Sequence, residues 1–248
     1  MANSIFPLRA ARLDDLYRRI GSGKVAFVDE STQVAPDRYG RTFYILAAAV
    51  FPVSGLDAAR EAIMAASHTG DSPHASQDFW GNRPAFRRAW SVVRDELDEC
   101  LIAVCAPLLP FDDGLSHAPG DPKRRLPVGE DSRAACLLGA VRELHARLGV
   151  RAVVADARDE RLDGSDRWVV GRLRAALPGG GRDLAFVHAR PSSEPLLAYA
   201  DFAAWAYRRF WTGQDREWFE SIRLATRLLR VPRDAPHVLS RPPGAVEP

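Results

Sequence analysis

A buried strand that runs directly into two carboxylates is the feature that most constrains this chain. The stretch KVAFVDEST, residues 24–32, places four apolar residues immediately before Asp29 and Glu30. Because the stretch is short, apolar and preceded by Gly-Ser-Gly, it predicts a buried strand over 24–28 that ends at Asp29. Burying a charge is costly unless something pairs with it. The sequence therefore raises the question of what lies opposite these acids.

A second apolar stretch ends in the same way. The sequence VRAVVAD, residues 150–156, predicts another buried strand, and its last residue is Asp156. If the two strands are parallel neighbours, their carboxyl ends lie side by side, about 5 Å apart. Ligands of open α/β sheets bind at this edge. Two like charges there repel each other, so we expect one carboxyl to be protonated unless a cation lies between them.

A third acid stands alone in an apolar helix. Asp201 is the only charged residue between Pro195 and Tyr207, and aspartate is a poor residue for a helix interior. A helix that follows the last strand would bring Asp201 across the same sheet edge. Three converging carboxylates form a site of hard oxygen ligands, which suits Mg²⁺ or Mn²⁺.

Each acid also has an ordinary explanation when it is taken singly. An acid at a strand end is commonly a turn or cap residue, which covers Asp29 and Asp156. Asp201 would pair equally well with an arginine such as Arg208, seven residues later on the same helix face. The conjunction of the three acids is what favours a functional site.

The remaining pattern predicts one α/β domain over 24–231, with a helical extension at 1–23 and an irregular proline-rich tail at 232–248. We expect a mixed sheet of five strands with helices on both faces. The other expected strands lie at 41–52, 100–109 and 183–189, and the expected helices at 10–20, 56–67, 83–99, 132–148, 166–177 and from 195 onward. Residues 68–82 read as a loop. Residues 110–131 read as a long excursion that is either a mobile functional loop or disordered.

Composition excludes several classes of protein. The 248 residues are 46% hydrophobic and 27% charged, and their net charge of +2 does not by itself argue for nucleic acid. Three cysteines without CxxC spacing argue against a disulfide framework and a zinc site. No signal peptide and no apolar run of about 18 residues is present. We therefore expect a cytoplasmic protein without a membrane span.

Several segments together resemble a known family. VDEST, FYILAAAVF, HASQDF, VVADARDE and SSEPLLAYADFAAWAYRR, taken in this order over residues 24–211, resemble the DUF3800 family. The resemblance implies a ribonuclease-H-like fold and a metal-dependent nuclease. The family's DES motif matches residues 29–31, its strand-four aspartate matches Asp156, and its LAD motif matches residues 199–201. Thr32 replaces the usual glycine and Tyr199 the usual leucine, and both departures leave the carboxylates in place.

The chemistry expected from this resemblance is two-metal phosphodiester hydrolysis, with ions about 4 Å apart. Asp29 would bridge the ions, and Asp156 and Asp201 would each hold one side. Glu30 points away from Asp29 if the strand is regular, so it contributes only if the chain bends there. His74 or Glu160 would act as the proton shuttle, although either residue is also an ordinary candidate for a solvated loop.

Basic and aromatic residues give a weaker indication of a nucleic-acid surface. The segment RLATRLLRVPR, residues 223–233, would place Arg223, Arg227 and Arg230 on one helical face. Together with Arg208 and Arg209 they would hold a nucleic-acid backbone, or else form a solvated basic face. Four tryptophans would stack bases or belong to the core: Trp80, Trp205, Trp211 and Trp218.

The function that these features favour is a nuclease that uses Mg²⁺ or Mn²⁺ and acts on RNA or DNA. Two alternatives stay open. One is a catalytically silent binding module of the same fold, and the other is a metal-dependent hydrolase of a small phosphorylated substrate. Retention of all three aspartates favours the nuclease. The GSGK sequence at 21–24 is not a phosphate-binding loop, because it precedes a strand instead of following one.

Overall fold

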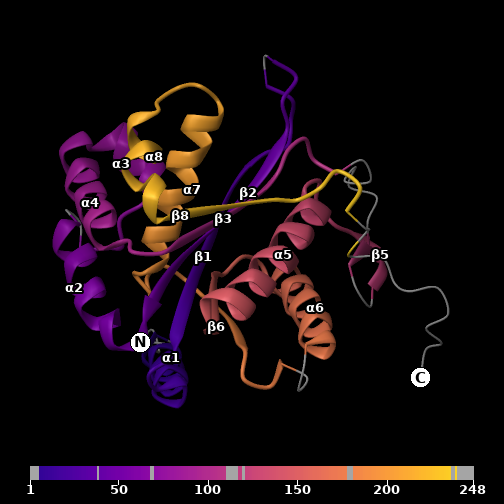
Figure 1. Ribbon diagram of the computed structural model, residues 1–248, viewed down its shortest axis with the longest axis horizontal. Coiled ribbons are helices and arrows are strands. Elements are labelled where there is room, and N and C mark those ends of the chain that lie inside the picture. The colour runs from indigo at the N-terminus through magenta and orange to yellow at the C-terminus, as the bar shows by residue number, and fades with distance from the viewer. Residues whose placement is uncertain are drawn as a thin grey trace, which may run out of the picture.

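The computed structural model describes residues 6–37, 39–67, 70–109, 117–118, 121–177, 181–235 and 238. At its centre is a mixed sheet of six strands, in the order β7-β6-β1-β2-β3-β8 (Figure 1). These strands are β1 Lys24–Gln33, β2 Phe43–Pro52, β3 Cys100–Cys105, β6 Val150–Asp156, β7 Ala185–Ala189 and β8 Thr226–Arg230. Strand β2 is antiparallel to both of its neighbours, and every other pair in the sheet is parallel.

The predicted α/β class and the mixed sheet are confirmed, but the predicted count of five strands is wrong. The sixth strand, β8, was expected to be part of an arginine-bearing helix. Its sequence TRLLR contains too few apolar residues to distinguish the period of a helix from that of a strand. Pairing with β3 makes this segment a strand. As an edge strand it keeps much of its surface exposed, including Leu228 at 46%.

Helices cover both faces of the sheet, as the sequence predicts (Figure 1). Alternate residues of β1 separate the two layers, because Val25 and Phe27 face one layer while Ala26 and Val28 face the other. One layer contains α1 Phe6–Ile20, α2 Leu56–Ala66, α3 Ala75–Gly81, α4 Arg83–Glu96, α7 Leu197–Trp211 and α8 Glu217–Ile222. The other layer contains α5 Glu130–Leu148 and α6 Glu160–Ala176.

Strand β1 is longer than the sequence suggests, and its two partners end at different points. Its parallel pairing with β6 stops at Val28 opposite Ala155. Its antiparallel pairing with β2 continues as far as Gln33 opposite Phe43. Asp29 is therefore the first residue of β1 beyond the parallel pair, and β1 and β2 project past it as a hairpin (Figure 1). The expectation that the strand ends at Asp29 is wrong, because β2 supplies hydrogen-bond partners to the segment that follows.

Two segments expected to be irregular contain structure. Residues 75–81 form α3, although they were expected to be a loop, because Asp78 caps the turn by accepting a hydrogen bond from the His74 N–H at 3.0 Å. Within the long excursion, β4 His117–Ala118 pairs with β5 Asp121–Arg125. Residues 110–116 and 119–120 of that excursion, and residues 236–237 and 239–248 of the tail, lie outside the described residues. None of the described helices is both long enough and apolar enough to cross a membrane.

A buried carboxylate fixes the start of α7. Glu194 is 1% exposed and lies just before α7. Its Oε2 accepts hydrogen bonds from the Tyr17 hydroxyl at 2.6 Å and from Arg60 Nη2 at 2.9 Å, and its Oε1 accepts one from Arg60 Nε at 3.0 Å. Burial and the adjacent Glu194 charge raise the pKa of Tyr17, which keeps the hydroxyl a donor. Helices α1 and α2 are thereby tied to the segment from which α7, and with it Asp201, begins.

We expect Glu194→Ala to lower the free energy of unfolding by about 3 kcal/mol, because it leaves the Arg60 guanidinium without its buried partner. Glu61→Ala, an exposed change on α2, is the control and should stay within about 0.5 kcal/mol of the parent. Urea unfolding curves measure both values. Equal midpoints and slopes for Glu194→Ala and the parent would show that Glu194 does not anchor α7.

Candidate functional site

Asp29 lies on the α7 side of β1, where the parallel pairing with β6 has just ended. It continues the alternation of Val25 and Phe27, whose side chains face that layer. Its Oδ1 accepts a hydrogen bond from the backbone N–H of Glu30 at 2.7 Å. Burial raises the pKa of Asp29 well above its usual range, and the charges of Asp201, Glu30 and Asp156 raise it further. Asp29 is thus the carboxyl on which the other acids converge.

Asp156 is the last residue of β6 and follows directly after the residue paired with Val28. Its side chain continues the alternation of Ala152 and Val154, which face the α7 layer. Burial raises its pKa from 3.8 to about 6, with further contributions from the charges of Glu30 and Asp201. Its Oδ1 is buried and accepts no hydrogen bond from any residue that the structure describes. This oxygen is therefore a buried acceptor without a donor in the described part of the chain.

Asp201 reaches the same place from α7. The helix is rich in alanine, and Ala200 and Ala203 are fully buried against the sheet, so its backbone can approach β1 closely. The Asp201 Oδ2 atom accepts a hydrogen bond from the Ala75 N–H at 2.7 Å and lies 3.5 Å from His74 Nδ1. Burial raises the pKa of Asp201, while His74 and the Ala75 N–H partly oppose that effect. The start of α3 therefore orients Asp201.

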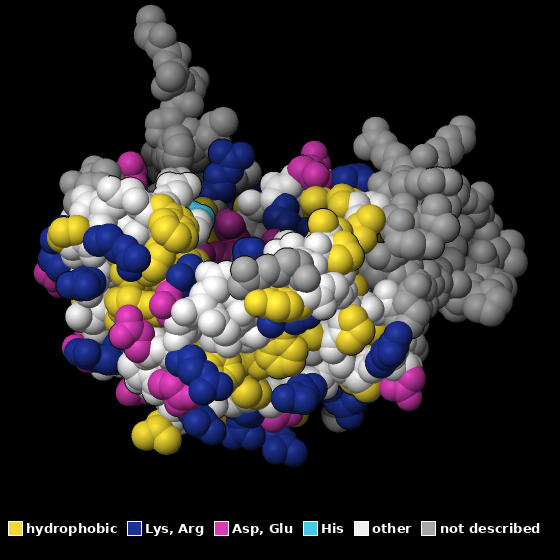
Figure 2. Space-filling model, turned by 90° about the horizontal axis from the view of Figure 1, so that it is seen from above, with side chains coloured by type: hydrophobic (Ala, Val, Ile, Leu, Met, Phe, Trp, Pro, Cys, Tyr) yellow, Lys and Arg dark blue, Asp and Glu magenta, His cyan; other side chains and the backbone are white. Residues whose placement is uncertain are grey.

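The three predicted aspartates are thus brought to one face of the sheet by β1, β6 and α7. Seen from the end at which the β1–β2 hairpin projects, acidic side chains lie at the floor of a hollow, with a histidine and several Lys or Arg side chains around them (Figure 2). The carboxylate oxygens of Asp29, Asp156 and Asp201 do not all lie within 4.8 Å of one another. Among the described residues, only the ligand atoms of Asp163, Asp166 and His188 lie that close together. If Asp29 is shared by two ions, one ion would lie between Asp29 and Asp156 and the other between Asp29 and Asp201. Asp156 and Asp201 then need not lie close to each other.

Glu30 belongs to the opposite face. Because β1 stays regular, Glu30 points toward α5, as the sequence analysis expects for an unbent strand. Its Oε2 accepts a hydrogen bond from Arg133 Nη1 at 2.6 Å, and Arg133 is 1% exposed. Glu30 acts on the α7-side acids through its charge, which raises the pKa values of Asp29 and Asp156. Its direct partner is an arginine.

Arg133 is the centre of a buried ion-pair network that the sequence analysis did not identify. It donates two hydrogen bonds to Asp166, at 2.9 and 2.7 Å, and one to the Tyr44 hydroxyl at 2.8 Å. Arg158 donates to Asp166 at 3.1 Å and to Glu130 at 2.6 Å. The partners come from β1, β2, α5 and α6 and share no sequence spacing. The one available signal was an arginine at the start of the otherwise buried helix α5.

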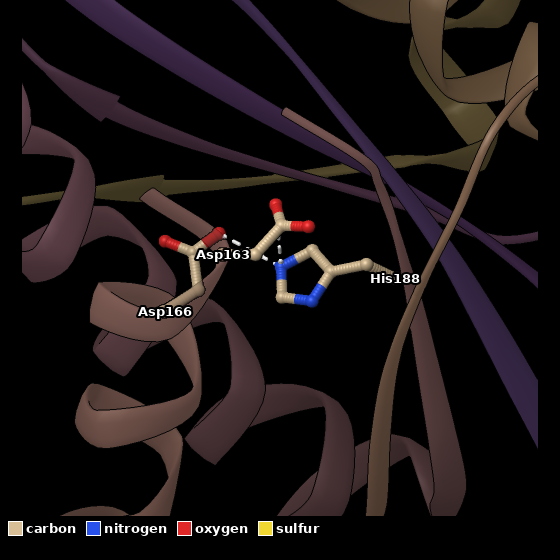
Figure 3. Close-up of side chains that lie close together, drawn as sticks. All are labelled: Asp163, Asp166 and His188. Carbon is tan, nitrogen blue, oxygen red and sulfur yellow. Dashed lines mark hydrogen bonds and ion pairs between the residues drawn. The ribbon is translucent and has the colours of Figure 1, made fainter. Parts of the chain in front are cut away.

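Asp163, Asp166 and His188 form the tightest acidic cluster of the described residues (Figure 3). His188 Nε2 lies 3.1 Å from Asp166 Oδ2 and 3.5 Å from Asp163 Oδ1. Although burial alone would raise the pKa of Asp166, Arg133, His188 and Arg158 together hold it well below its usual range. Both Asp166 oxygens already accept hydrogen bonds from arginine. The two guanidiniums occupy the role that a metal cation would have, so this cluster is an ion-pair network.

The two proposed proton shuttles have different surroundings. His74 precedes α3, beside Asp201, and its side chain is 48% exposed, so it touches both the acids and solvent. Glu160 is exposed in the first turn of α6, in the other helical layer. His74 therefore lies next to Asp201, whereas Glu160 lies on the opposite face of the sheet, in the layer of α5 and α6.

The arginines expected to hold nucleic acid do not share one surface. Arg208 and Arg209 lie at the end of α7, where Arg208 donates to Gln33 at 3.2 Å and Arg209 to Asp215 at 2.6 Å. Arg223 pairs with Glu220 at 3.2 Å. Arg227 is on the edge strand β8 and lies 3.6 Å from Glu143 of α5, in the other layer. The expectation that Arg223, Arg227 and Arg230 share a helical face is wrong, because residues 226–230 form a strand.

Asp156→Asn should stabilise the metal-free protein at pH 8 by about 0.5–2 kcal/mol, since it removes a buried charge and leaves no hydrogen-bond donor without its partner. A carboxyl with a raised native pKa holds its proton more tightly when folded, so its stabilising contribution is lost as pH rises from about 4 through 6. The gain from the variant should therefore be present at pH 8 and absent near pH 4.

Urea unfolding in EDTA at both pH values measures this gain, with the exposed Asp98→Asn as control. A variant that is less stable than the parent at pH 8 would mean that Asp156 has a partner whose loss is costly.

Comparison with models of known protein families, with curated protein sequences and with solved structures found no match to this chain.

Proposed function

We propose that this protein is a nuclease that uses Mg²⁺ or Mn²⁺ to hydrolyse phosphodiester bonds in nucleic acid. The observation that carries the proposal is the convergence of Asp29, Asp156 and Asp201 on one face of the sheet, with the pKa of each raised by burial. Carboxyl groups with strongly perturbed pKa values concentrate at functional sites. Buried like charges are costly unless a cation offsets them.

The donor set fits a hard divalent cation. Three carboxylates supply oxygen ligands only, and Mg²⁺ and Mn²⁺ prefer such ligands. The unpartnered Asp156 Oδ1 is an acceptor that protein donors do not satisfy in the described part of the chain. By contrast, Asp166 in the other layer is already saturated by arginine. Of the two acidic clusters, the one on the α7 side is the one whose carboxylates form no ion pair with an arginine that the structure describes.

We assign the roles within the site by position. The charges of Asp156 and Asp201 both raise the pKa of Asp29. Asp29 would therefore be the shared ligand, with Asp156 and Asp201 on either side. Bound cations would supply Lewis-acid stabilisation of the phosphoryl oxygens and a water of lowered pKa. The Ala75 N–H holds one oxygen of Asp201 in place. His74, half exposed beside Asp201, would give a proton to the departing oxygen.

The sheet supports the finer part of the proposal, which is a ribonuclease-H-like domain of the DUF3800 type. The antiparallel β2, the parallel pairing of β1 with β6, and the helix that follows β7 together deliver the three acids to one edge. These are the positions that the resemblance to the family assigns to its carboxylates. Nucleic acid, as RNA or DNA, is the proposed partner.

A panel of labelled single-stranded and duplex RNA and DNA, incubated with the full chain, tests this function. We expect cleavage with Mg²⁺ or Mn²⁺ and none in EDTA. Asp29→Asn should lower the rate by orders of magnitude, because the shared ligand serves both ions. Asp183→Asn is the matched control, because Asp183 precedes β7 and pairs with Arg151 near the opposite edge of the sheet. That control should cleave at the parent rate.

Two outcomes would contradict the nuclease. Cleavage that is undiminished in Asp29→Asn would place the activity elsewhere. Absence of cleavage for every nucleic acid, in the presence of either metal, would leave a silent binding module or a hydrolase of a small phosphorylated substrate as the better description.

A further inference from the structure

One tryptophan lies on the surface beside the acidic site. Of the four tryptophans considered as stacking residues, Trp205 is 7% exposed, and Trp211 and Trp218 pack against the core. Trp80 is 73% exposed. A tryptophan this exposed leaves most of its ring surface open to solvent, where a base can stack on it.

Two arginines lie over the ring of Phe79, the buried neighbour of Trp80. The buried ring of Phe79 packs against Trp80 with their centroids 5.0 Å apart. The Arg83 guanidinium carbon lies 3.4 Å from the centre of the Phe79 ring, and that of Arg209 lies 4.4 Å from it. Arg209 is also 5.8 Å from the centre of the Trp80 ring. Trp80, Arg83 and Arg209 therefore form one aromatic and cationic patch, which we call the Trp80 patch.

The charges of the patch are unequally used. Arg209 donates a hydrogen bond to Asp215, which offsets much of its charge. Arg83 is exposed and forms no ion pair with any residue that the structure describes. A guanidinium held over an aromatic ring with its N–H groups free is a ready ligand for phosphate. The patch thus offers a stacking surface and an adjacent site for an anion.

Helix α3 connects the patch to the acidic site. Its first residue, Ala75, donates to Asp201, and Trp80 follows five residues later, about 7 Å further along the helix axis. A cavity of about 380 Å³ lies along the side of this helix that presents His74, Gln77, Asp78 and Gly81. At about 3.4 Å per stacked nucleotide, the separation corresponds to roughly two nucleotides. A strand cleaved at the aspartates would therefore reach Trp80 within a few nucleotides.

We propose that the Trp80 patch binds single-stranded nucleic acid, with a base stacked on Trp80 and a phosphate on Arg83. This inference deepens the proposed nuclease function, on which it rests, by naming single strands as the substrate class. Stacking requires an unpaired base face, which a duplex does not offer in its interior. The stacking interaction is the same for RNA and DNA, so the two are separate arms of the test.

Fluorescence anisotropy of labelled single strands of about ten nucleotides, in EDTA so that no strand is cut, measures the affinity. We expect Trp80→Ala to weaken binding about tenfold and Trp80→Phe to retain most of the affinity, for RNA, DNA or both. Arg83→Gln should lower the slope of log affinity against log salt concentration by about 1, the value for one phosphate contact. The matching duplex should bind more weakly, with little effect of Trp80→Ala.

Trp168 on α6 provides the matched control, because it is another tryptophan with an arginine over its ring, Arg172 at 4.8 Å, in the opposite layer. Trp168→Ala should bind as the parent does, and thermal melts should confirm that every variant is folded. Equal affinity of Trp80→Ala and the parent would overturn the proposal. So would an absence of single-strand binding by the parent, which would assign the patch to a protein partner.

These results separate the patch from the nuclease. Binding that depends on Trp80, found together with an absence of metal-dependent cleavage, would support the patch and contradict the nuclease. Cleavage that depends on Asp29, found together with unchanged binding and cleavage by Trp80→Ala, would contradict the patch and support the nuclease.

Discussion

The candidate site depends on where the pairing of β1 with β6 stops. The last parallel pair joins Val28 to Ala155, and the next residue of each strand is an aspartate. Because the residues before these acids are apolar and buried on both faces of the sheet, the acids themselves are partly buried at the point where the parallel pairing ends. The continuation of β1 with β2 fixes Asp29 in an extended conformation, and α7 closes the same face with Asp201. The fold thus concentrates negative charge in one place.

The two faces of the sheet resolve buried negative charge in opposite ways. On the α5 side, Arg133 and Arg158 form ion pairs with Glu30, Asp166 and Glu130, and the pKa of Asp166 falls below its usual range. On the α7 side the pKa of Asp29 rises instead, because of burial first and then of the neighbouring acids Asp201, Glu30 and Asp156. The pKa values of chemically identical carboxyl groups therefore shift in opposite directions because of their surroundings. Arginine pairs with the acids of one cluster, and we propose that a divalent cation does so in the other.

The sequence was informative where one residue's type conflicted with its surroundings. Asp29 and Asp156 at the ends of apolar runs, and Asp201 in an alanine-rich helix, each stood out singly, and the parallel sheet explains why they share a face. Strand β8 was missed because arginines interrupt its short apolar pattern.

The buried network around Arg133 was missed because it joins residues from four elements without any regular spacing. Helix α3 was missed because its cap depends on Asp78 and on contact with α7. Local pattern predicts elements and isolated anomalies, whereas partners from distant segments emerge only from the folded arrangement.

Manganese binding, followed by the loss of the free Mn²⁺ signal in electron paramagnetic resonance, tests the central claim most directly, because it asks which acidic cluster holds a cation. The account predicts that the parent binds Mn²⁺, that Asp29→Asn weakens binding by at least about 10- to 100-fold, and that Asp163→Asn binds as the parent does. Binding that survives Asp29→Asn and is lost in Asp163→Asn would contradict the account and place the metal in the cluster with His188.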